Sequence, residues 1–364
     1  MSSPVRIDQV IPAIVEHDAV SNHTFEAQRL LRGMGFASEI YARIVGPGCE
    51  GRVHPIEELP RRAEEGEWLL YQCSIGSPAA DVFAARPGTK LLDYHNITPA
   101  HLVERWIPPL GDETRLGRAQ LAALAPFVSF ALADSAFNES ELTTAGYART
   151  RVVPVLVEGG NIEAVPSPEA VSRLERAKAE GGSDWLFVGQ VAPHKAQHDL
   201  VKAFAAYRRA YDPRARLHVV GREMGSAYID ALRRFVLDVG LGSSVEITGS
   251  VPVGDLAAYF ATADVFVCVS DHEGFCAPVV EAMHREVPVV AYATAALPET
   301  VGDGGVLLPE KSPALVAAAV HGLLSVPGRR EALVAAGARQ AARYTLDAAR
   351  SAFRSAIEEA VARA

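Results

Sequence analysis

Short apolar runs alternate with longer amphipathic segments through most of this chain, and this alternation constrains its fold more than any other feature. Runs such as 185–189 and 265–269 are almost entirely apolar, whereas stretches such as 115–125 repeat Leu and Ala at helical spacing. Short β-branched runs that alternate with helical segments are typical of parallel sheets with helices on both faces. The sequence therefore predicts an α/β fold.

The same alternation predicts where the individual elements lie. In the first half we expect strands at 5–11, 38–41, 68–71, 90–93, 129–133 and 151–154, and helices at 23–32 and 115–125. In the second half we expect strands at 185–189, 216–221, 245–248, 265–269, 288–291 and 306–308, and helices at 200–211, 228–239, 255–261 and 313–324. Residues 328–364 are rich in Ala and Arg and are expected to be helical throughout. Asn138, followed three residues later by Glu141, is typical of a capping box and predicts that a short helix starts there.

Turn-forming residues separate the two halves. The Val-Glu-Gly-Gly-Asn sequence at 157–161 is followed by a polar, charge-rich stretch up to Asp184. The 364 residues are enough for two domains, at about 100–200 residues each. We therefore expect two α/β domains, 1–157 and 158–345, and a last helix at 346–364.

The charge balance excludes one class of partner. The chain carries 35 Lys and Arg against 44 Asp and Glu, a formal charge of −9, and has no block of basic residues. Nucleic-acid-binding proteins need a basic surface that neutralises phosphates, so we expect no nucleic-acid partner.

Cysteine spacing and hydropathy indicate which structural sites and which cellular location to expect. The four Cys residues lie far apart without a CxxC pair, which indicates neither a zinc ribbon nor a disulfide framework. The N-terminus lacks the apolar stretch of a signal peptide, and Pro126 and Ser129 interrupt the longest apolar-rich run, 121–133. We expect a cytoplasmic protein with no transmembrane segment. A site peripheral to a membrane stays open, and the sequence does not indicate an oligomeric state.

One glycine motif matches a dinucleotide-binding pattern but lacks the helix that such a site needs. Residues 46–51 match GxGxxG and follow an expected strand, but a dinucleotide site also needs its third glycine to open a helix. Pro55 and the charged residues around it disfavour a helix at that point. We interpret the motif as a surface loop.

The most informative segment is 270–283, Ser-Asp-His-Glu-Gly-Phe-Cys-Ala-Pro-Val-Val-Glu-Ala-Met. The strand at 265–269 delivers the chain to a loop at its carboxyl end, and Pro278 fits the first turn of a helix. The start of that helix suits a phosphate or an oxyanion, and the carboxylates of Glu273 and Glu281 could accept hydrogen bonds from hydroxyls. The alternatives are a helix-cap carboxylate at Glu273 and a solvated one at Glu281. The apolar neighbours of Glu281 argue for a semi-buried carboxylate that needs a partner.

This segment resembles the E-x7-E motif of glycosyltransferase family 4. Further matching pieces lie in the expected order at 186–189 with Lys195, 217–221, 245–249, 263–267, 288–292 and 297–300, and more loosely at 94–96 and 133–138. The resemblance implies a GT-B fold, in which two Rossmann-like α/β domains face each other across a cleft. It places the acceptor on domain 1–157 and the nucleotide-sugar donor on domain 158–345, and it lets the helix at 346–364 cross back to the first domain. It also implies retention of anomeric configuration and no required metal or other cofactor.

The family's donor-site roles carry over to matching positions of this chain. Glu273 would hold the hydroxyls of the donor sugar, and Glu281 would accept hydrogen bonds from the ribose. The N–H groups that would approach the sugar and the diphosphate belong to Gly274, Phe275 and Cys276.

Two further residues would act on the reacting groups. Lys195, which follows Gly189 at the end of its strand, would neutralise the diphosphate leaving group, where charge develops in the transition state. His95, at the end of a strand in the first domain, would face the donor sugar. The alternative for His95 is a strand-end histidine with a local hydrogen-bond partner.

The chain departs from the family at two loops. The family usually has Arg directly after the Val-Gly of the first strand in this domain, whereas this chain has Gln190, whose neutral amide cannot offset phosphate charge. Arg222 at the next strand end could substitute for it, and a solvated loop cation is the alternative. The first strand-to-helix loop lacks the usual Gly-Gly, and Asp18, Ser21 and Asn22 there could face the acceptor, which the resemblance places on this domain, or the donor sugar.

These residues predict a retaining glycosyltransferase that moves a sugar from a nucleoside diphosphate sugar to an acceptor hydroxyl. The donor could be a UDP-, GDP- or other sugar nucleotide, and the acceptor a glycan, a lipid-linked sugar or a small molecule. We expect no metal site, because neighbouring side chains in the Asp271-His272-Glu273 sequence would point to opposite sides. The alternatives are a sugar-nucleotide epimerase or hydrolase on the same fold, and a non-catalytic nucleotide-sugar-binding protein.

Overall fold

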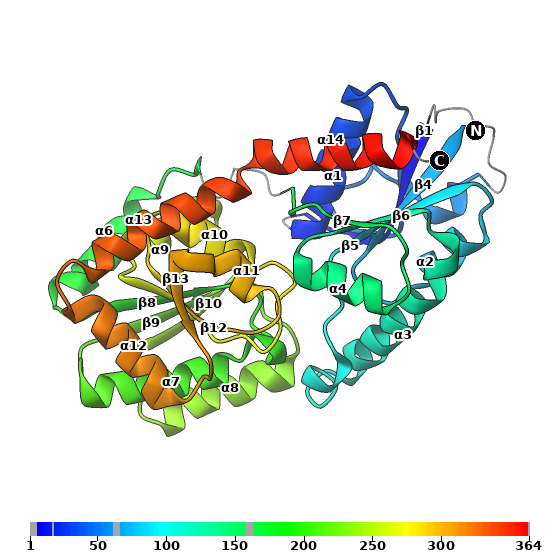
Figure 1. The fold of residues 1–364 in the computed structure, drawn as a ribbon. Coiled ribbons are helices and arrows are strands. Elements are labelled where there is room, and N and C mark those ends of the chain that lie inside the picture. Colours follow the sequence, from blue (N-terminus) through cyan, green and yellow to red (C-terminus); the bar gives the residue numbers. More distant parts are fainter. Residues whose placement is uncertain (1–5, 17, 61–65, 157–162, 363–364) are drawn as a thin grey trace. The chain divides into compact units, whose positions relative to one another are not determined.

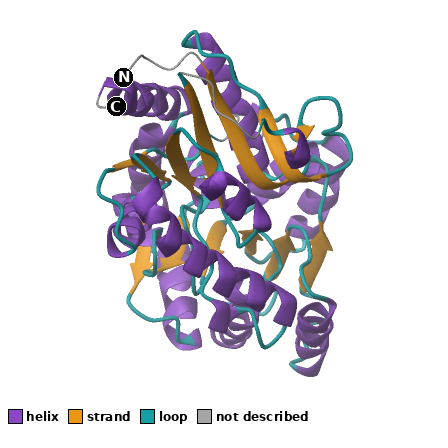
Figure 2. Ribbon diagram, turned by 90° about the vertical axis from the view of Figure 1, so that its right-hand side faces the viewer, coloured by secondary structure: helices purple, strands orange, loops and turns teal. Residues whose placement is uncertain are grey.

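The structure is a computed structural model that describes residues 6–16, 18–60, 66–156 and 163–362 (Figure 1). Contacts divide the chain into two compact units, the first formed by residues 1–100, 109–158 and 345–364 and the second by residues 101–108 and 159–344. Each unit holds one parallel sheet that is flanked by helices (Figure 2). The predicted α/β class is therefore confirmed. The turn expected at 157–161 lies outside the described residues.

The first unit is built on a seven-stranded sheet in the order β3-β2-β1-β4-β5-β6-β7. Its strands are β1 (Arg6–Ile14), β2 (Ile40–Val45), β3 (His54–Pro55), β4 (Glu67–Cys73), β5 (Thr89–Tyr94), β6 (Phe130–Ala133) and β7 (Thr150–Val152). Its helices are α1 (Ala19–Gly33), α2 (Pro78–Ala85), α3 (Pro108–Leu124), α4 (Ala136–Thr144) and α14 (Leu346–Ala362). The expected surface loop at 46–51 is confirmed, since β2 ends at Val45 and turns follow.

The last helix of the chain packs into the core of the first unit. Phe353 and Ile357 of α14 join the cluster that contains Leu30 and Leu31 of α1. An ion pair between Arg350 Nε and Glu26 Oε1, 2.7 Å apart, adds to this contact. The apolar stripe of α14 therefore has a defined partner within this unit.

The second unit is built on a six-stranded sheet in the order β10-β9-β8-β11-β12-β13. Its strands are β8 (Asp184–Val188), β9 (Arg216–Val220), β10 (Val245–Gly249), β11 (Val265–Cys268), β12 (Val289–Tyr292) and β13 (Gly305–Leu308). Its helices are α6 (Pro168–Ala179), α7 (Gln197–Ala210), α8 (Ser226–Asp238), α9 (Val253–Thr262), α10 (Ala277–His284), α11 (Leu297–Val301), α12 (Pro313–Ser325) and α13 (Arg329–Ala341).

The strand order of the second unit defines where a ligand can bind. From β8 the chain adds β9 and β10 on one side and then returns to place β11 on the other side of β8. In an open α/β sheet, ligands bind at the carboxyl ends of the strands where the order reverses in this way. That point lies between β8 and β11, so the loops after these two strands are the primary candidates for a site.

The segment 101–108 belongs to the second unit, although the predicted division placed it in the first domain. The Trp106 ring packs edge to face on Tyr228 of α8, with 5.6 Å between the ring centroids. A Cβ at Gly225 would come within 2.5 Å of the Ile107 side chain, so the backbone approaches Ile107 closely there. Such apolar contacts between distant segments leave no periodic signal in the sequence.

The predicted bounds of two helical segments were wrong. The capping box at Asn138 was misplaced, because α4 begins earlier at Ala136 and Ser135 is its N-cap, with Oγ accepting from Asn138 N at 3.1 Å. The helix expected over 328–364 is interrupted, because Thr345 Oγ1 accepts from Ala348 N at 3.2 Å and caps a new helix, α14. The polar stretch before Asp184, for which no element was predicted, contains α6, which buries Ala170 and Leu174.

Among the described residues, no helix is both long enough and apolar enough to cross a membrane.

Candidate active site

The carboxyl edge of the second sheet brings Lys195 and Glu273 into direct contact. Lys195 ends the short helical turn η4 (Pro193–Lys195) after β8, and Glu273 lies in the loop after β11. Lys195 Nζ donates to Glu273 Oε2 at 2.6 Å, and the two side chains are 18% and 5% exposed. Burial alone would lower the pKa of Lys195, but the Glu273 carboxylate raises it above its ordinary value. A charged, largely buried ion pair therefore lies at the point where the strand order reverses.

Backbone hydrogen bonds hold the loop that carries Glu273. Asp271 N donates to the His194 carbonyl at 2.8 Å, which ties this loop to η4. Ala296 N donates to the Glu273 carbonyl at 3.2 Å, and Thr300 Oγ1 donates to the Phe275 carbonyl at 2.6 Å. The loop is thus held by η4 on one side and by α11 and its N-cap residue Ala296 on the other.

A second ion-pair cluster, which sequence reasoning missed, supports the same loop. Lys311 follows β13, and its Nζ lies 2.5 Å from Asp271 Oδ1 and 2.7 Å from Asp199 Oδ2. Asp199 belongs to the first turn of α7, so one lysine joins the loops after β11 and β13 to this helix. Lys311 is far from the E-x7-E segment in sequence, and no local pattern marks it.

Glu281 lies inside α10 and is 4% exposed, which excludes the solvated alternative. It follows Val279 and Val280, both buried, as the sequence indicated. Its charge acts on Arg285, whose pKa is lowered by burial although Glu281 opposes that shift. The helix begins at Ala277, directly after Gly274, Phe275 and Cys276, so these three residues precede its amino terminus.

The backbone segments that carry Gln190 and Arg222 lie side by side at the strand ends. Val191 N donates to the Arg222 carbonyl at 2.8 Å, so the backbone after Gln190 runs next to Arg222. Gly189 and Gly221 both have positive φ, and a Cβ at Gly221 would meet the Gly189 carbonyl oxygen at 2.0 Å. Only glycine allows this close approach. The Arg222 side chain is exposed, which is compatible with both alternatives for this residue.

A buried chain of hydrogen bonds places a proton on Nε2 of His95 in the first unit. Gln9 Nε2 donates to the Thr24 carbonyl, so Gln9 Oε1 accepts from Gln72 Nε2 at 2.7 Å. Gln72 Oε1 must then accept from His95 Nε2 at 2.6 Å, while His95 Nδ1 faces Asp134 Oδ1 at 3.1 Å.

With Asp134 ionised, both ring nitrogens of His95 act as donors, which describes a cationic imidazolium. Burial alone would lower the pKa of His95, but Asp134 and Asp93 raise it to about 9. These contacts agree with the alternative for His95, a strand-end histidine with local hydrogen-bond partners.

A further buried histidine extends this network. His23 Nε2 lies 2.8 Å from Asp93 Oδ2, and both side chains are fully buried. His23 Nδ1 accepts from Leu156 N at 3.0 Å. Sequence reasoning missed Gln9, Gln72 and Asp93, but a signal was present, because each is a polar residue next to apolar ones in a strand and needs a partner when the strand is buried.

The loop after β1 is organised differently from the prediction. Helix α1 begins at Ala19, earlier than expected, and Asp18 is its N-cap. Asp18 Oδ2 accepts from both the N–H and the hydroxyl of Ser21, each at 3.0 Å, and Ser21 Oγ accepts from Val15 N. Ser21 is fully buried and donates within the cap, whereas Asn22 is half-buried. His17 of this loop lies outside the described residues.

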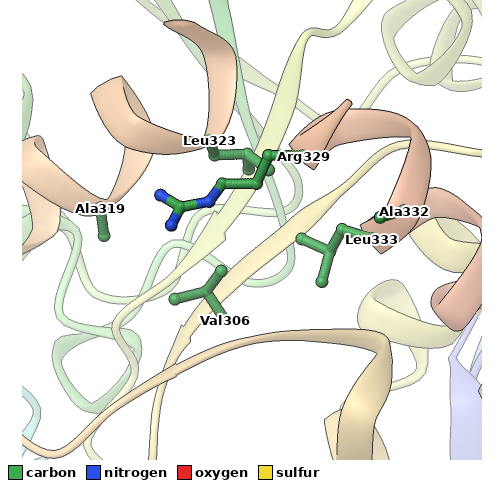
Figure 3. Close-up of a pocket in the computed structure, with 6 residues that line it drawn as sticks. All are labelled: Val306, Ala319, Leu323, Arg329, Ala332 and Leu333. Atoms are coloured by element: carbon green, nitrogen blue, oxygen red, sulfur yellow. The ribbon is translucent and has the colours of Figure 1, made fainter. Parts of the chain in front are cut away.

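A surface hollow of the second unit is lined by none of these groups (Figure 3). It has a volume of about 420 Å³ and is lined by Val306, Ala319, Leu323, Arg329, Ala332 and Leu333. These residues come from β13, α12 and α13, and none of them was predicted as a site residue. We assign no chemistry to this hollow.

Comparison with known proteins decides the family. The profile of the family described as "Glycosyl transferases group 1" matches residues 171–340, which contain Lys195, Glu273 and Glu281. The chain is 34% identical over 387 residues to the D-inositol 3-phosphate glycosyltransferase of Frankia alni, with 92% of each chain covered. The chain belongs to the group 1 glycosyl transferases.

Other comparisons agree with this assignment. The chain is 33% identical over 260 residues to the D-inositol 3-phosphate glycosyltransferase of Geodermatophilus obscurus, with 68% of this chain but only 56% of that relative covered. The structure of this glycosyltransferase matches the crystal structure of Anabaena Alr3699/HepE in complex with UDP and glucose with a TM-score of 0.77 at 17% identity, covering 97% and 100% of the two chains. The predicted GT-B fold is thereby confirmed.

Proposed function

We propose that this glycosyltransferase is a retaining enzyme that moves a sugar from a nucleoside diphosphate sugar to an acceptor hydroxyl. The observation that carries the proposal is the Lys195–Glu273 ion pair at the reversal of strand order in the second sheet. A buried ammonium there can neutralise a departing diphosphate, and a carboxylate beside it can accept hydrogen bonds from sugar hydroxyls.

In this proposal the donor binds to the loops after β8, β9 and β11. The N–H groups of Gly274, Phe275 and Cys276, with the start of α10, meet the diphosphate and the sugar. Glu281 accepts hydrogen bonds from the ribose. Gly189 and Gln190 line the strand end, and Arg222 supplies the charge that Gln190 lacks.

The same groups supply the chemistry of transfer. The diphosphate leaves with its charge stabilised by Lys195, and the acceptor hydroxyl attacks from the face that the diphosphate leaves. A phosphate oxygen of the donor takes the acceptor proton, so no side-chain nucleophile is required and no metal takes part. Trapping of a sugar on Glu273 would instead support double displacement.

We propose different contributions for the first-unit residues. Both ring nitrogens of His95 already donate to Asp134 and Gln72, so His95 contributes a fixed positive charge rather than a mobile proton. Asp18 and Asn22 remain candidates for contact with a sugar. Ser21 holds the cap of α1.

A donor-turnover assay tests this function. Purified protein is incubated with UDP-, GDP-, ADP- and TDP-sugars, with Mg²⁺ or EDTA, and nucleoside diphosphate release is measured with and without acceptor. The acceptor panel includes inositol 3-phosphate, because the names of two relatives point to it. K195M is the matched inactive control.

The expected result is acceptor-dependent release from one nucleotide class, unaffected by EDTA, with the donor's anomeric configuration kept in the product. Equal turnover of the donor without any acceptor would indicate a hydrolase or an epimerase. Donor binding without release under all conditions would indicate a non-catalytic binding protein.

A further inference from the structure

A cluster of sulfur and carboxylate atoms lies directly beside Lys195. Cys268 Sγ, a carboxylate oxygen of Glu273 and Cys276 Sγ all lie within 4.8 Å of one another. Cys268 is fully buried and Cys276 is 9% exposed, and both thiols are free. The roles proposed for Glu273 leave these two thiols without a function.

The fold explains why these two cysteines come together, although their spacing in the sequence is too long for a CxxC motif. Cys268 is the last residue of β11, and Cys276 is the N-cap of α10. Cys276 has φ 70° and ψ 65°, the left-handed conformation that residues other than glycine seldom adopt. The loop between them thus folds back, so that both sulfur atoms lie on the same carboxylate.

The charge of Lys195 beside the cluster disfavours a bound metal ion and permits a disulfide. Two thiols and a carboxylate are a possible ligand set for a thiophilic dication such as Zn²⁺. Such an ion would have to displace the Lys195 ammonium, which lies 2.6 Å from Glu273 Oε2. A disulfide carries no charge and leaves this ion pair in place.

We propose that Cys268 and Cys276 form an internal disulfide when the protein meets a hydroperoxide. One thiol attacks the peroxide, so that an S–O bond forms and the O–O bond breaks to give a sulfenic acid and water. The second thiol attacks that sulfur, the S–S bond forms and the S–O bond breaks with loss of another water. Two thiols and one hydrogen peroxide thus give one disulfide and two waters, whichever thiol reacts first.

The thiols already interact in the reduced protein. Their mutual hydrogen bond lowers the pKa of Cys268 and raises that of Cys276. The bond itself does not depend on the proposed function. Its effect on donor binding does rest on that function, because the disulfide joins both ends of the loop whose N–H groups are proposed to meet the donor.

Peptide mapping tests the bond directly. The protein is treated with hydrogen peroxide, denatured, alkylated without reduction and digested with trypsin. Both cysteines fall in one tryptic peptide, 235–285, because no Lys or Arg lies between Arg234 and Arg285. The expected peptide is lighter by two hydrogen atoms and carries no alkyl label. Cleavage at Glu273, between the two cysteines, leaves the fragments joined until dithiothreitol is added.

Variants separate this reaction from general oxidation. C268A and C276A should each leave the remaining thiol of the peptide open to alkylation or to oxygen addition, and C73A, which removes a buried cysteine of the first unit, should still form the bond. A peptide that keeps both alkyl labels, or that carries only added oxygen, would overturn the proposal. Protection that is released by EDTA instead of dithiothreitol would also overturn it and assign the cluster to a metal.

Donor binding is measured on the same samples. Oxidised protein should lose the rise in melting temperature that a bound sugar nucleotide produces, and dithiothreitol should restore it. A mapped disulfide together with an unchanged donor response would refute the effect on donor binding and keep the bond. Reduced protein that responds to no sugar nucleotide would count against the proposed function and not against the disulfide.

Discussion

Replacing Lys195 with methionine should remove about 3 kcal/mol from the free energy of unfolding of the second unit. The Nζ–Oε2 distance is 2.6 Å, and Glu273 is 5% exposed, so the variant leaves an uncompensated carboxylate in a buried place. Breaking a buried pair in this way costs roughly 3–5 kcal/mol, whereas exposed pairs contribute about 0–1 kcal/mol. The 18% exposure of Lys195 favours the lower end of the buried range.

A double-mutant cycle isolates the pair. K195M with E273Q replaces both charges with neutral groups, so we expect the double variant to lose only about 1 kcal/mol, less than K195M alone. K202M is the matched control, because Lys202 is a lysine of the neighbouring helix α7 that is 47% exposed and pairs with Asp199 at the surface. Its expected loss is about 0.5 kcal/mol or less.

Urea unfolding followed by tryptophan fluorescence measures these losses. The three Trp residues are Trp68, Trp106 and Trp185. In a W68F background the remaining two belong to the second unit, so the transition reports on that unit. A K195M variant as stable as K202M, or a double variant whose loss equals the sum of the single losses, would refute the argument that this pair is buried and coupled.

Three further predictions follow from the same contacts. Because the folded-state pKa of His95 is raised to about 9, its stabilising charge is fully present below its ordinary pKa of 6.5 and is lost as pH rises through 9. The melting temperature should therefore fall over this pH range in the wild type and fall less in H95Q. Equal pH profiles of the two proteins would contradict a charged His95. Because the Arg222 side chain is exposed, R222A should change the free energy of unfolding by no more than about 0.5 kcal/mol. If Arg222 contacts phosphate, the same variant should raise the KM for the donor about tenfold. Unchanged donor kinetics would remove Arg222 from the site. S135A should lower the free energy of unfolding, measured by urea unfolding, by about 1 kcal/mol because the α4 cap is lost. S140A is the control, since Ser140 lies on the exposed face of the same helix, and it should change the free energy of unfolding little.

The sequence predicted the elements of the second unit well because their signals are local. Strand β11 is buried on both faces and therefore reads as a continuous apolar run, and Pro278 marks the first turn of α10. The E-x7-E spacing places Glu273 in the loop and Glu281 in the helix, as the structure shows. The direct contact of Lys195 with Glu273 was not predicted, and it arises because the order of the strands brings the loops after β8 and β11 together.

The features that sequence reasoning missed depend on distant residues. Lys311 meets Asp199 and Asp271 only because three strands end at the same edge of the sheet. The hydrogen-bond chain from Gln9 through Gln72 to His95 likewise crosses neighbouring strands. A polar residue inside an apolar strand shows that a partner must exist, but it does not identify that partner.

The misplaced start of α1 has a local cause instead. Asp18, Ser21 and Asn22 are all good N-cap residues, and a sequence with several candidates does not show which one the fold uses. The fold uses Asp18, because Ser21 is buried and accepts the Val15 N–H. The residues proposed for the acceptor side therefore changed more than those proposed for the donor side.

The measurement that tests the central claim most directly is a thermal-shift titration of wild-type protein and K195M with nucleoside diphosphates and their sugars, in the presence of EDTA. A ligand that binds only the folded protein raises its melting temperature with concentration. The account predicts that one nucleotide class stabilises the wild type and that the shift is strongly reduced in K195M. Stabilisation by none of the nucleotides, or an equal shift in both proteins, would contradict a donor site at Lys195 and Glu273.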